Sequence, residues 1–401
     1  MLGRSITHRS QRAIVTSIRT TAPTHMSPQP PKLFSSSSSS LPSWPHAMVE
    51  SKGDYKDEAY LEDVIGGPLY QYQKSLPRLP VPELAQTLKK LLPTALPLAS
   101  TPEETEKFIE AVEAFPVEAA ELHKRLVERR EKEGNDSSWL QYWWNTAGYL
   151  QVRDPVVVNV SYFFHFVDDT TLPQQNMIQR GAALLAATAE FRLMVASGSL
   201  PAQTIGRGDK KTPLCSVAMK YMFHTCRIPR LENDTVRLYD PSCHSHAVIA
   251  CRGQFYALDF LDEDGQALPL ETIEARLKEC VELSESDAAS LPSLGWLTSH
   301  DRDSWATARA ELVDMGLNEA LERLESGAIL LCLDMDESPV SRTQCGNLFW
   351  TGGISSGHNR WFDKSIQLMV GKNGKAGLIG EHSMMDGECG IMLSLSHQGE
   401  C

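Results

Sequence analysis

Hydrophobic residues recur at helical spacing along several stretches of the chain. After Glu83, leucines separated by three or four residues predict an amphipathic helix. A second helix is predicted to begin at Thr101, because this residue can cap a helix and is followed by Pro102 and two glutamates. Helical spacing, with an alanine-rich run in the first case, predicts further helices over 176–197, 215–226, 270–283, 302–315 and 318–326.

Other stretches favour strands because they are rich in β-branched and aromatic residues. Residues 156–166 carry no charged residue, which predicts a buried strand or the entry to one. Closely spaced prolines predict an extended segment over 70–82, and 262–265 has the composition of a hairpin turn. Strands are also predicted over 246–250, 254–260, 294–299, 329–334 and 365–370. The alternation of elements predicts a mixed α/β fold with a β-sheet flanked by helices.

Length and composition are those of a folded protein with a substantial core. The chain has 401 residues, of which 42% are hydrophobic and 22% charged, enough for one large core or two ordinary ones. Its net charge of -13 argues against general binding to nucleic acid or to anionic membranes, since both need a positive field. No apolar run has the length of a membrane-spanning helix.

The cysteines and histidines predict neither a disulfide framework nor a metal site. The nine cysteines are scattered, odd in number and without a Cys-x-x-Cys pair, which is typical of a reducing compartment. His244 and His246 are close enough to share a metal, but no further set of closely spaced ligands accompanies them. We therefore expect ordinary histidines and no metal.

Charge is distributed unevenly, with a basic segment at the start of the chain. Residues 1–49 contain five arginines and lysines and no acidic residue, and they are rich in serine and threonine. This predicts a mitochondrial-type presequence, with a basic helix over 4–19, followed by a disordered serine-rich linker. A basic tail without a targeting role is the alternative. Met26 and Met48 are further potential starts, and starting there would shorten or remove the signal.

Close to the end of the sequence, a histidine stands four residues before an aspartate. His382 follows Glu381, and Asp386 precedes Gly387. An imidazole titrates near neutral pH and can take a proton from a hydroxyl or a thiol, while a nearby carboxylate can fix its tautomer. Taken alone, this spacing is as typical of a surface turn as of a catalytic base.

Several longer motifs, in this order along the chain, resemble the choline/carnitine acyltransferase family. The resemblance covers residues from about 70 to 387 and is strongest to members that exchange acetyl groups between CoA and carnitine. The stretches that carry it are Tyr72 to Pro82, Trp143-Trp144, Tyr149-Leu150, Arg153 to Val157, Cys226 to Pro229, Leu297 to Ser299, Arg302 to Ala306, Asn359 to Lys364 and Glu381-His382.

The resemblance implies an enzyme and assigns roles to three residues. His382 is expected to be the general base, and Asp386 an acidic residue of the same site. Tyr149 matches a family tyrosine near the carnitine end of the active-site tunnel, where its face could attract a trimethylammonium group, although packing against the neighbouring tryptophans is an equal alternative. Direct transfer needs no protein nucleophile, which suits a chain without a Gly-x-Ser-x-Gly motif.

Two assignments stay open within the resemblance. Asp386 is expected to orient His382, to contact substrate, or to pair with an arginine that holds its loop. The segment 359–364 is expected to brace the sheet beside the histidine rather than to touch substrate. The resemblance implies no bound cofactor, because coenzyme A or acetyl-CoA is a co-substrate. It implies carnitine as the other small-molecule substrate.

After Gly387 the sequence departs from the family pattern. Residues 388–401 are expected to be an aberrant tail, and 50–387 the part of the family domain that carries the histidine. The family has a second, similarly folded domain beyond this point, with most of the coenzyme A site, so the resemblance assigns no cofactor-binding residue here. A frameshift, a retained intron or a faulty gene model is expected to explain the difference, with a genuine short isoform as the alternative.

The expected function is carnitine O-acetyl transfer in the mitochondrial matrix. The alternatives are an inactive or binding-only half-protein with exposed apolar surface, and a CoA-dependent acyltransferase that uses choline or a longer acyl chain. Peroxisomes are the alternative location, and peripheral association with the inner mitochondrial membrane fits the resemblance.

Overall fold

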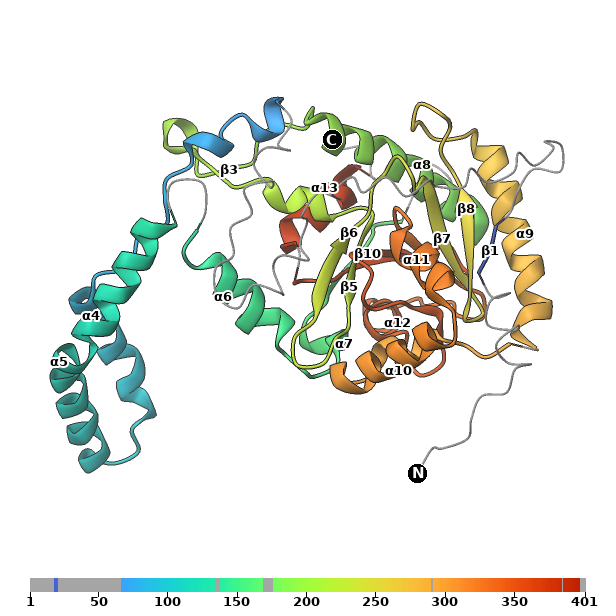
Figure 1. The fold of residues 1–401 in the computed structure, drawn as a ribbon. Coiled ribbons are helices and arrows are strands. Elements are labelled where there is room, and N and C mark those ends of the chain that lie inside the picture. Colours follow the sequence, from blue (N-terminus) through green and yellow to red (C-terminus); the bar gives the residue numbers. More distant parts are fainter. Residues whose placement is uncertain are drawn as a thin grey trace.

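A computed structural model describes residues 18–20, 66–133, 138–168, 176–289, 291–383 and 385–396. Within them lies a sheet of seven strands in the order β1-β8-β7-β9-β10-β11-β2 (Figure 1). The strands are β1 (Ile18–Thr20), β2 (Tyr162–His165), β7 (His246–Cys251), β8 (Gln254–Asp259), β9 (Leu330–Asp334), β10 (Ile366–Gly371) and β11 (Ala376–Gly380).

The sheet is mixed. β7, β9 and β10 run parallel, whereas β8, β11 and β2 each pair antiparallel with a neighbour. The central strands are buried on both faces, because successive side chains point to opposite sides and both sides are covered by helices. In β9, Leu331 and Leu333 face one core, and Leu330 and Cys332 face the other. The predicted mixed α/β class is confirmed.

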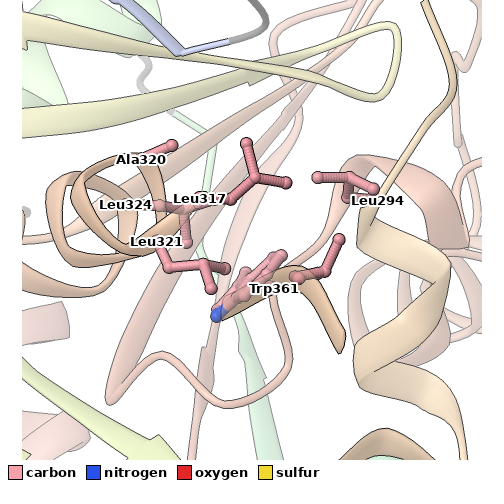
Figure 2. A pocket seen from close by; sticks show the side chains of 7 residues that line it. Leu294, Leu317, Ala320, Leu321, Leu324 and Trp361 are labelled. Carbon is pink, nitrogen blue, oxygen red and sulfur yellow. The ribbon is translucent and has the colours of Figure 1, made fainter. Parts of the chain in front are cut away.

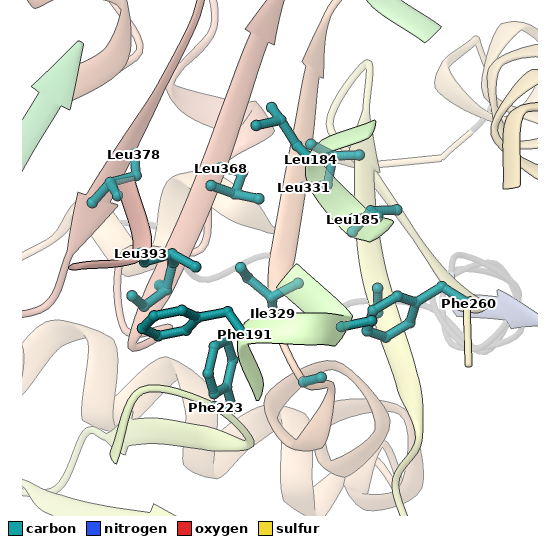
Figure 3. Packing of buried hydrophobic residues seen from close by; sticks show 14 of the residues in the cluster. Leu184, Leu185, Phe191, Phe223, Phe260, Ile329, Leu331, Leu368, Leu378 and Leu393 are labelled. Atoms are coloured by element: carbon teal, nitrogen blue, oxygen red, sulfur yellow. The ribbon is translucent and has the colours of Figure 1, made fainter. Parts of the chain in front are cut away.

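Helices α8 (Met177–Ser197) and α9 (Leu270–Ala288) cover one face of the sheet. Figure 3 shows Leu184, Leu185 and Phe191 of α8 packed toward strand residues, with Leu393 of the last helix, α13 (Gly387–Ser396), beside them. A second core lies on the opposite face of the sheet. It is covered by α10 (Arg302–Asp314), α11 (Asn318–Ser326) and α12 (Arg342–Thr351).

The second core contains a small apolar cavity next to Trp361 (Figure 2). About 10 Å³ is free for water-sized contents, which is at the lower limit for a single water molecule. The lining carries almost no polar surface, so the cavity is a packing defect and not a ligand site. It is lined by Leu294, Leu312, Leu317, Ala320, Leu321, Leu324 and Trp361.

A helical hairpin of α4 (Leu84–Ala95) and α5 (Pro102–Lys132) projects from the α/β body (Figure 1). The predicted start of α5 is confirmed: the Thr101 side chain accepts a hydrogen bond from the backbone N–H of Glu104. Shorter elements join the hairpin to β2: α6 (Gln141–Asn145), a π-helical turn (Thr146–Leu150) and α7 (Val156–Asn159). Between α8 and β7, β3 (Thr204–Ile205) pairs with β4 (Thr212–Pro213), and β5 (Thr225–Ile228) pairs with β6 (Thr235–Leu238).

Two predicted elements are wrong. Residues 215–226 form a short 3₁₀ helix, Val217–Tyr221, followed by β5, because His224 adopts a left-handed conformation (φ 55°) that ends helical structure. Residues 294–299 are not a strand but contain a 3₁₀ helix, Gly295–Ser299. Leu294 and Leu297, three residues apart, both pack on the second core, which is helical spacing.

Differences at the start of the chain are smaller. The segment 70–82 is extended only after a 3₁₀ helix, Gln73–Ser75. Ile18–Thr20 is a strand paired parallel with β8, not the end of a basic helix. The rest of the predicted presequence lies outside the described residues. The structure contains no helix, within the part it describes, that is both long and apolar enough to cross a membrane.

Two buried histidines make the fold sensitive to acid. Burial lowers the pKa of His224 to about 3 and that of His246 to about 4. In the unfolded chain both have a pKa of about 6.5, so the unfolded state takes up protons first as the pH falls. The stability that the two neutral rings contribute is fully present at pH values above this unfolded-state pKa and is lost progressively at lower pH.

We expect the free energy of unfolding to fall by about 2 kcal/mol per histidine between pH 7.5 and pH 5. Urea titrations at the two pH values measure this loss. The variant His224→Gln should show roughly half of it. A midpoint that is independent of pH in this window would contradict the assignment.

Candidate active site

Glu381 and His382 directly follow β11, whose last residue, Gly380, pairs with Tyr162 of β2. The backbone N–H of Glu381 donates to the Ser365 carbonyl (3.0 Å), so the chain is held to the sheet up to this residue. The Glu381 side chain is fully buried, whereas that of His382 is 32% exposed. The sheet thus presents an accessible imidazole on a fixed backbone.

The predicted pair is brought together in space. His382 Nε2 lies 3.2 Å from Asp386 Oδ1. This contact lowers the pKa of Asp386, with help from the backbone N–H of Gly387, and the carboxylate is therefore ionised at neutral pH. When Nε2 donates to Asp386, the neutral ring keeps its lone pair on Nδ1, where it can accept a proton.

Two tyrosines flank the His382 ring. The ring centroids of Tyr149 and Tyr162 lie 5.4 Å and 5.2 Å from it, both in edge-to-face geometry. Tyr149 also lies 6.3 Å from Trp144, so its ring packs on one of the neighbouring tryptophans and also stands beside His382. Burial, followed by the charges of Asp386 and Glu381, raises the pKa of Tyr149, which keeps its hydroxyl neutral.

Tyr162 was not identified from the sequence. Its hydroxyl donates to the Asp386 carbonyl (3.2 Å), which ties β2 to the loop that carries the carboxylate. Burial raises its pKa, so it acts as a neutral donor. Its only sequence signal is an aromatic residue within the strand-like stretch 156–166.

Gly380 makes room for Tyr162. A methyl group on Gly380 would overlap the Tyr162 ring and hydroxyl. We expect Gly380→Ala to lower the free energy of unfolding by about 1–3 kcal/mol, because overpacking forces shifts in the backbone and the side chains. Chemical denaturation measures the change. Gly148→Ala is the control, since nothing lies within 4 Å of a Cβ there, and equal effects of the two would contradict the argument.

A buried guanidinium holds the residue next to the histidine. Arg227 Nη1 donates to Glu381 Oε1 (3.1 Å), and Nη2 donates to the Tyr149 carbonyl (3.0 Å). Glu381 also accepts hydrogen bonds from the backbone N–H and the hydroxyl of Ser383. The sequence resemblance included both Arg227 and Glu381, but it assigned neither a role.

Arg227 belongs to a larger buried ion network. Its Nε donates to Asp234 Oδ2 (2.8 Å), which also accepts from Arg302 Nε (2.6 Å). Arg302 pairs in turn with Asp363 (2.7 Å), and Trp305 donates to the same carboxylate (2.6 Å). The network links β5, α10 and the segment before β10 to the site, because each charge needs its partners once it is out of water.

The segment 359–364 is buried and makes structural contacts. Arg360 forms two 2.8 Å hydrogen bonds to Asp334 at the end of β9. Lys364 donates to the carbonyls of Glu325 and Gly327, and burial lowers its pKa to about 8. These contacts fit the bracing role expected from the sequence.

No group of three or more His, Cys, Asp or Glu side chains suited to a metal occurs among the described residues. His246 Nε2 lies 2.7 Å from the Arg323 carbonyl, and the ring of His244 stands 6.5 Å from that of His246. The two histidines therefore have ordinary protein contacts.

A mixed α/β fold that presents an imidazole hydrogen-bonded to a carboxylate is suited to general acid–base chemistry in group transfer. The family model described as choline/carnitine O-acyltransferase matches residues 79–397. The chain belongs to this family. The matched range includes 388–397, part of the segment expected to leave the family pattern.

Relatives within the family differ in the acyl group that their names specify. The chain is 31% identical to the mitochondrial carnitine O-acetyltransferase of Saccharomyces cerevisiae, over 82% of this chain and 49% of that protein. It is 28% identical to human mitochondrial carnitine O-palmitoyltransferase 2, over 86% and 54%. It is 29% identical to mouse peroxisomal carnitine O-octanoyltransferase, over 82% and 53%. The chain spans about half the length of these relatives.

Among solved structures, a chloramphenicol acetyltransferase matches with a TM-score of 0.23 and 14% identity, over 62% of this chain and 90% of that one. A similarity this low adds nothing to the assignment.

Proposed function

We propose that the chain carries the catalytic histidine of a carnitine O-acyltransferase, which moves an acetyl group reversibly between coenzyme A and carnitine. His382 is the general base. It takes the proton from the carnitine hydroxyl as the oxygen attacks the thioester carbonyl, and it returns the proton to the departing thiolate. In the reverse direction the thiol is the proton donor. Coenzyme A is a co-substrate, and the reaction needs no bound cofactor.

The hydrogen bond between His382 and Asp386 carries the proposal. It fixes one ring nitrogen and leaves the other free on a partly exposed imidazole, which is what proton transfer to a bound substrate requires. Asp386 is proposed to orient the ring and to stabilise the imidazolium that forms. Family membership supplies the reaction type, and the geometry supplies a base that can perform it.

Tyr149 is proposed to contact the trimethylammonium group of carnitine. Its ring stands beside His382, and a neutral tyrosine face attracts a quaternary ammonium ion. The contact would place the carnitine hydroxyl near the imidazole. Packing on Trp144 then serves to hold the ring in position.

The acetyl group is the part of the proposal that relatives leave open, because acetyl-, octanoyl- and palmitoyltransferases match at similar identity. The test is thiol release by the 401-residue chain from acetyl-, octanoyl- and palmitoyl-CoA, each with carnitine or choline. We expect acetyl-CoA with carnitine to react fastest. Faster release from a longer acyl-CoA, or with choline, would support acyl transfer but reject acetyl-CoA or carnitine as the preferred substrate.

A binding-only half-protein is the second candidate. Trp144, which packs on Tyr149, is 59% exposed, and Trp143 beside it in the sequence is 39% exposed, which is unusual for large aromatic side chains. This candidate predicts no thiol release with any substrate pair, together with retained carnitine binding by calorimetry. Measurable release would reject it.

Mitochondrial targeting is proposed from the basic segment 1–49, with peroxisomes as the alternative. Relatives named for both organelles match the chain. Fluorescence microscopy of the chain with and without residues 1–49 tests the targeting role. Peripheral association with the inner membrane is tested in the same cells by fractionation.

A further inference from the structure

We propose that Arg227 is a positioning residue that sets where Tyr149 stands relative to His382. This inference rests on the proposed function, since it assigns Tyr149 to carnitine and His382 to proton transfer. Arg227 touches neither substrate nor the imidazole. It acts through Glu381 on one side and through the Tyr149 backbone on the other.

The first contact fixes the histidine's neighbour. Glu381 is fully buried and its two oxygens are shared between Arg227 and Ser383. Because Glu381 is adjacent to His382 and its backbone is bonded to Ser365, its side chain determines how the chain leaves β11. A buried carboxylate without its cation would have to protonate or move.

The second contact fixes the tyrosine. Tyr149 belongs to the π-helical turn Thr146–Leu150, a departure from regular α-helix. Its carbonyl accepts from the backbone N–H of Val152 at 3.1 Å and from Arg227 Nη2 at 3.0 Å. The two terminal nitrogens of one planar guanidinium therefore hold the two sides of the site at a fixed separation.

The guanidinium itself is immobile. Arg227 is fully buried, its Nε donates to Asp234, and its backbone N–H donates to the Asp363 carbonyl. A lysine at this position keeps the charge but has a single nitrogen, which cannot reach Asp234, Glu381 and the Tyr149 carbonyl with the same planar geometry. Substitution by lysine thus separates charge from positioning.

The test compares Arg227→Lys with Arg302→Lys in the full chain. Arg302 is equally buried and donates to the same Asp234 oxygen, but its other side-chain partner is Asp363, and neither Glu381 nor the Tyr149 carbonyl is among its partners. The two substitutions should cost similar stability. Only Arg227→Lys should disturb the site. Glu381→Gln serves as a second variant, because the amide keeps the side-chain volume but removes the negative charge and one of the two oxygens that Arg227 and Ser383 share.

We expect Arg227→Lys to lower kcat about 10–100-fold and to raise the KM for carnitine, because small displacements of reacting groups cost about 10²-fold. Arg302→Lys should stay within about threefold of the wild type. Rates are measured at a temperature where all variants are folded. Equal effects of the two arginine variants would overturn the proposal, since both would then act through stability alone.

Nuclear magnetic resonance of ¹⁵N-labelled histidine gives a readout that does not depend on activity. The His382 signal, assigned by its loss in His382→Gln, should report a single tautomer in the wild type and in Arg302→Lys. In Arg227→Lys and Glu381→Gln it should become a mixture of tautomers. An unchanged signal in both of these variants would overturn the positioning role.

The two readouts also separate this proposal from the proposed function. A wild-type chain without acyl transfer, but with the expected difference between the His382 signals, would reject the function and keep Arg227 as the residue that orders His382. An active wild type whose variants are indistinguishable would keep the function and reject the role of Arg227.

Discussion

Replacing His382 with alanine should lower acyl transfer about 10²–10⁴-fold, the usual contribution of a positioned general base. The imidazole is the proposed proton acceptor, and Asp386 cannot replace it, because a carboxylate is a much weaker base than an imidazole and the backbone N–H of Gly387 lowers the pKa of this carboxyl further. The measurement is kcat for thiol release at pH 7.5 with the 401-residue chain.

His300→Ala is the matched control for this experiment. The side chain of His300 is 63% exposed and its partner, Asp301, lies outside the site, so its removal should leave the rate unchanged. Normal transfer by His382→Ala would show that another group takes the proton. Equal losses in both variants would point to a general effect of histidine removal.

Asp234→Asn should cost about 3–5 kcal/mol of unfolding free energy, the range for breaking a buried ion pair from one side. Asp234 is fully buried and accepts from Arg227, Arg302 and Arg153. With an amide in its place, two fully buried guanidiniums would lose their shared anion. Urea denaturation at pH 7.5 measures the loss.

Asp303→Asn is the control for the buried network. Asp303 also pairs with Arg153, at 3.1 Å, but its side chain is 50% exposed. Exposed pairs contribute about 0–1 kcal/mol because water and salt screen them. Similar losses for Asp234→Asn and Asp303→Asn would mean that burial does not set the strength of these contacts.

Local sequence patterns correctly predicted those helices and strands in which the spacing of apolar residues matches the buried face. The helix at 176–197 and the strands at 246–250 and 254–260 are present, because their spacing or β-branched content agrees with their burial. The helix predicted over 215–226 is reduced to a short 3₁₀ helix, because the left-handed backbone of His224 ends it and the residues after His224 pair as β5 with β6. Such pairing depends on residues that the local pattern does not contain.

The candidate site divides in the same way. His382 and Asp386 were found because the pair is four residues apart and belongs to one motif. The contact of Arg227 with Glu381 spans 154 residues, and that of Tyr162 with Asp386 spans 224. Only the family resemblance drew attention to Arg227 and Glu381, and Tyr162 was marked only as an aromatic residue in the strand-like stretch 156–166.

The position of the site directly after β11 makes the chain sensitive to deletions in the turn before this strand. Residues 372–375 join β10 to β11, and side chains along a strand alternate between its two faces. Deleting one residue from this connection would move β11 by one position against β10 and turn every side chain to the opposite face. Glu381 and His382 would then turn toward the opposite sides of the sheet, and Glu381 would lose its contact with Arg227. Reading-frame-preserving deletions should therefore be selected against here far more strongly than substitutions, although the turn itself touches no part of the site.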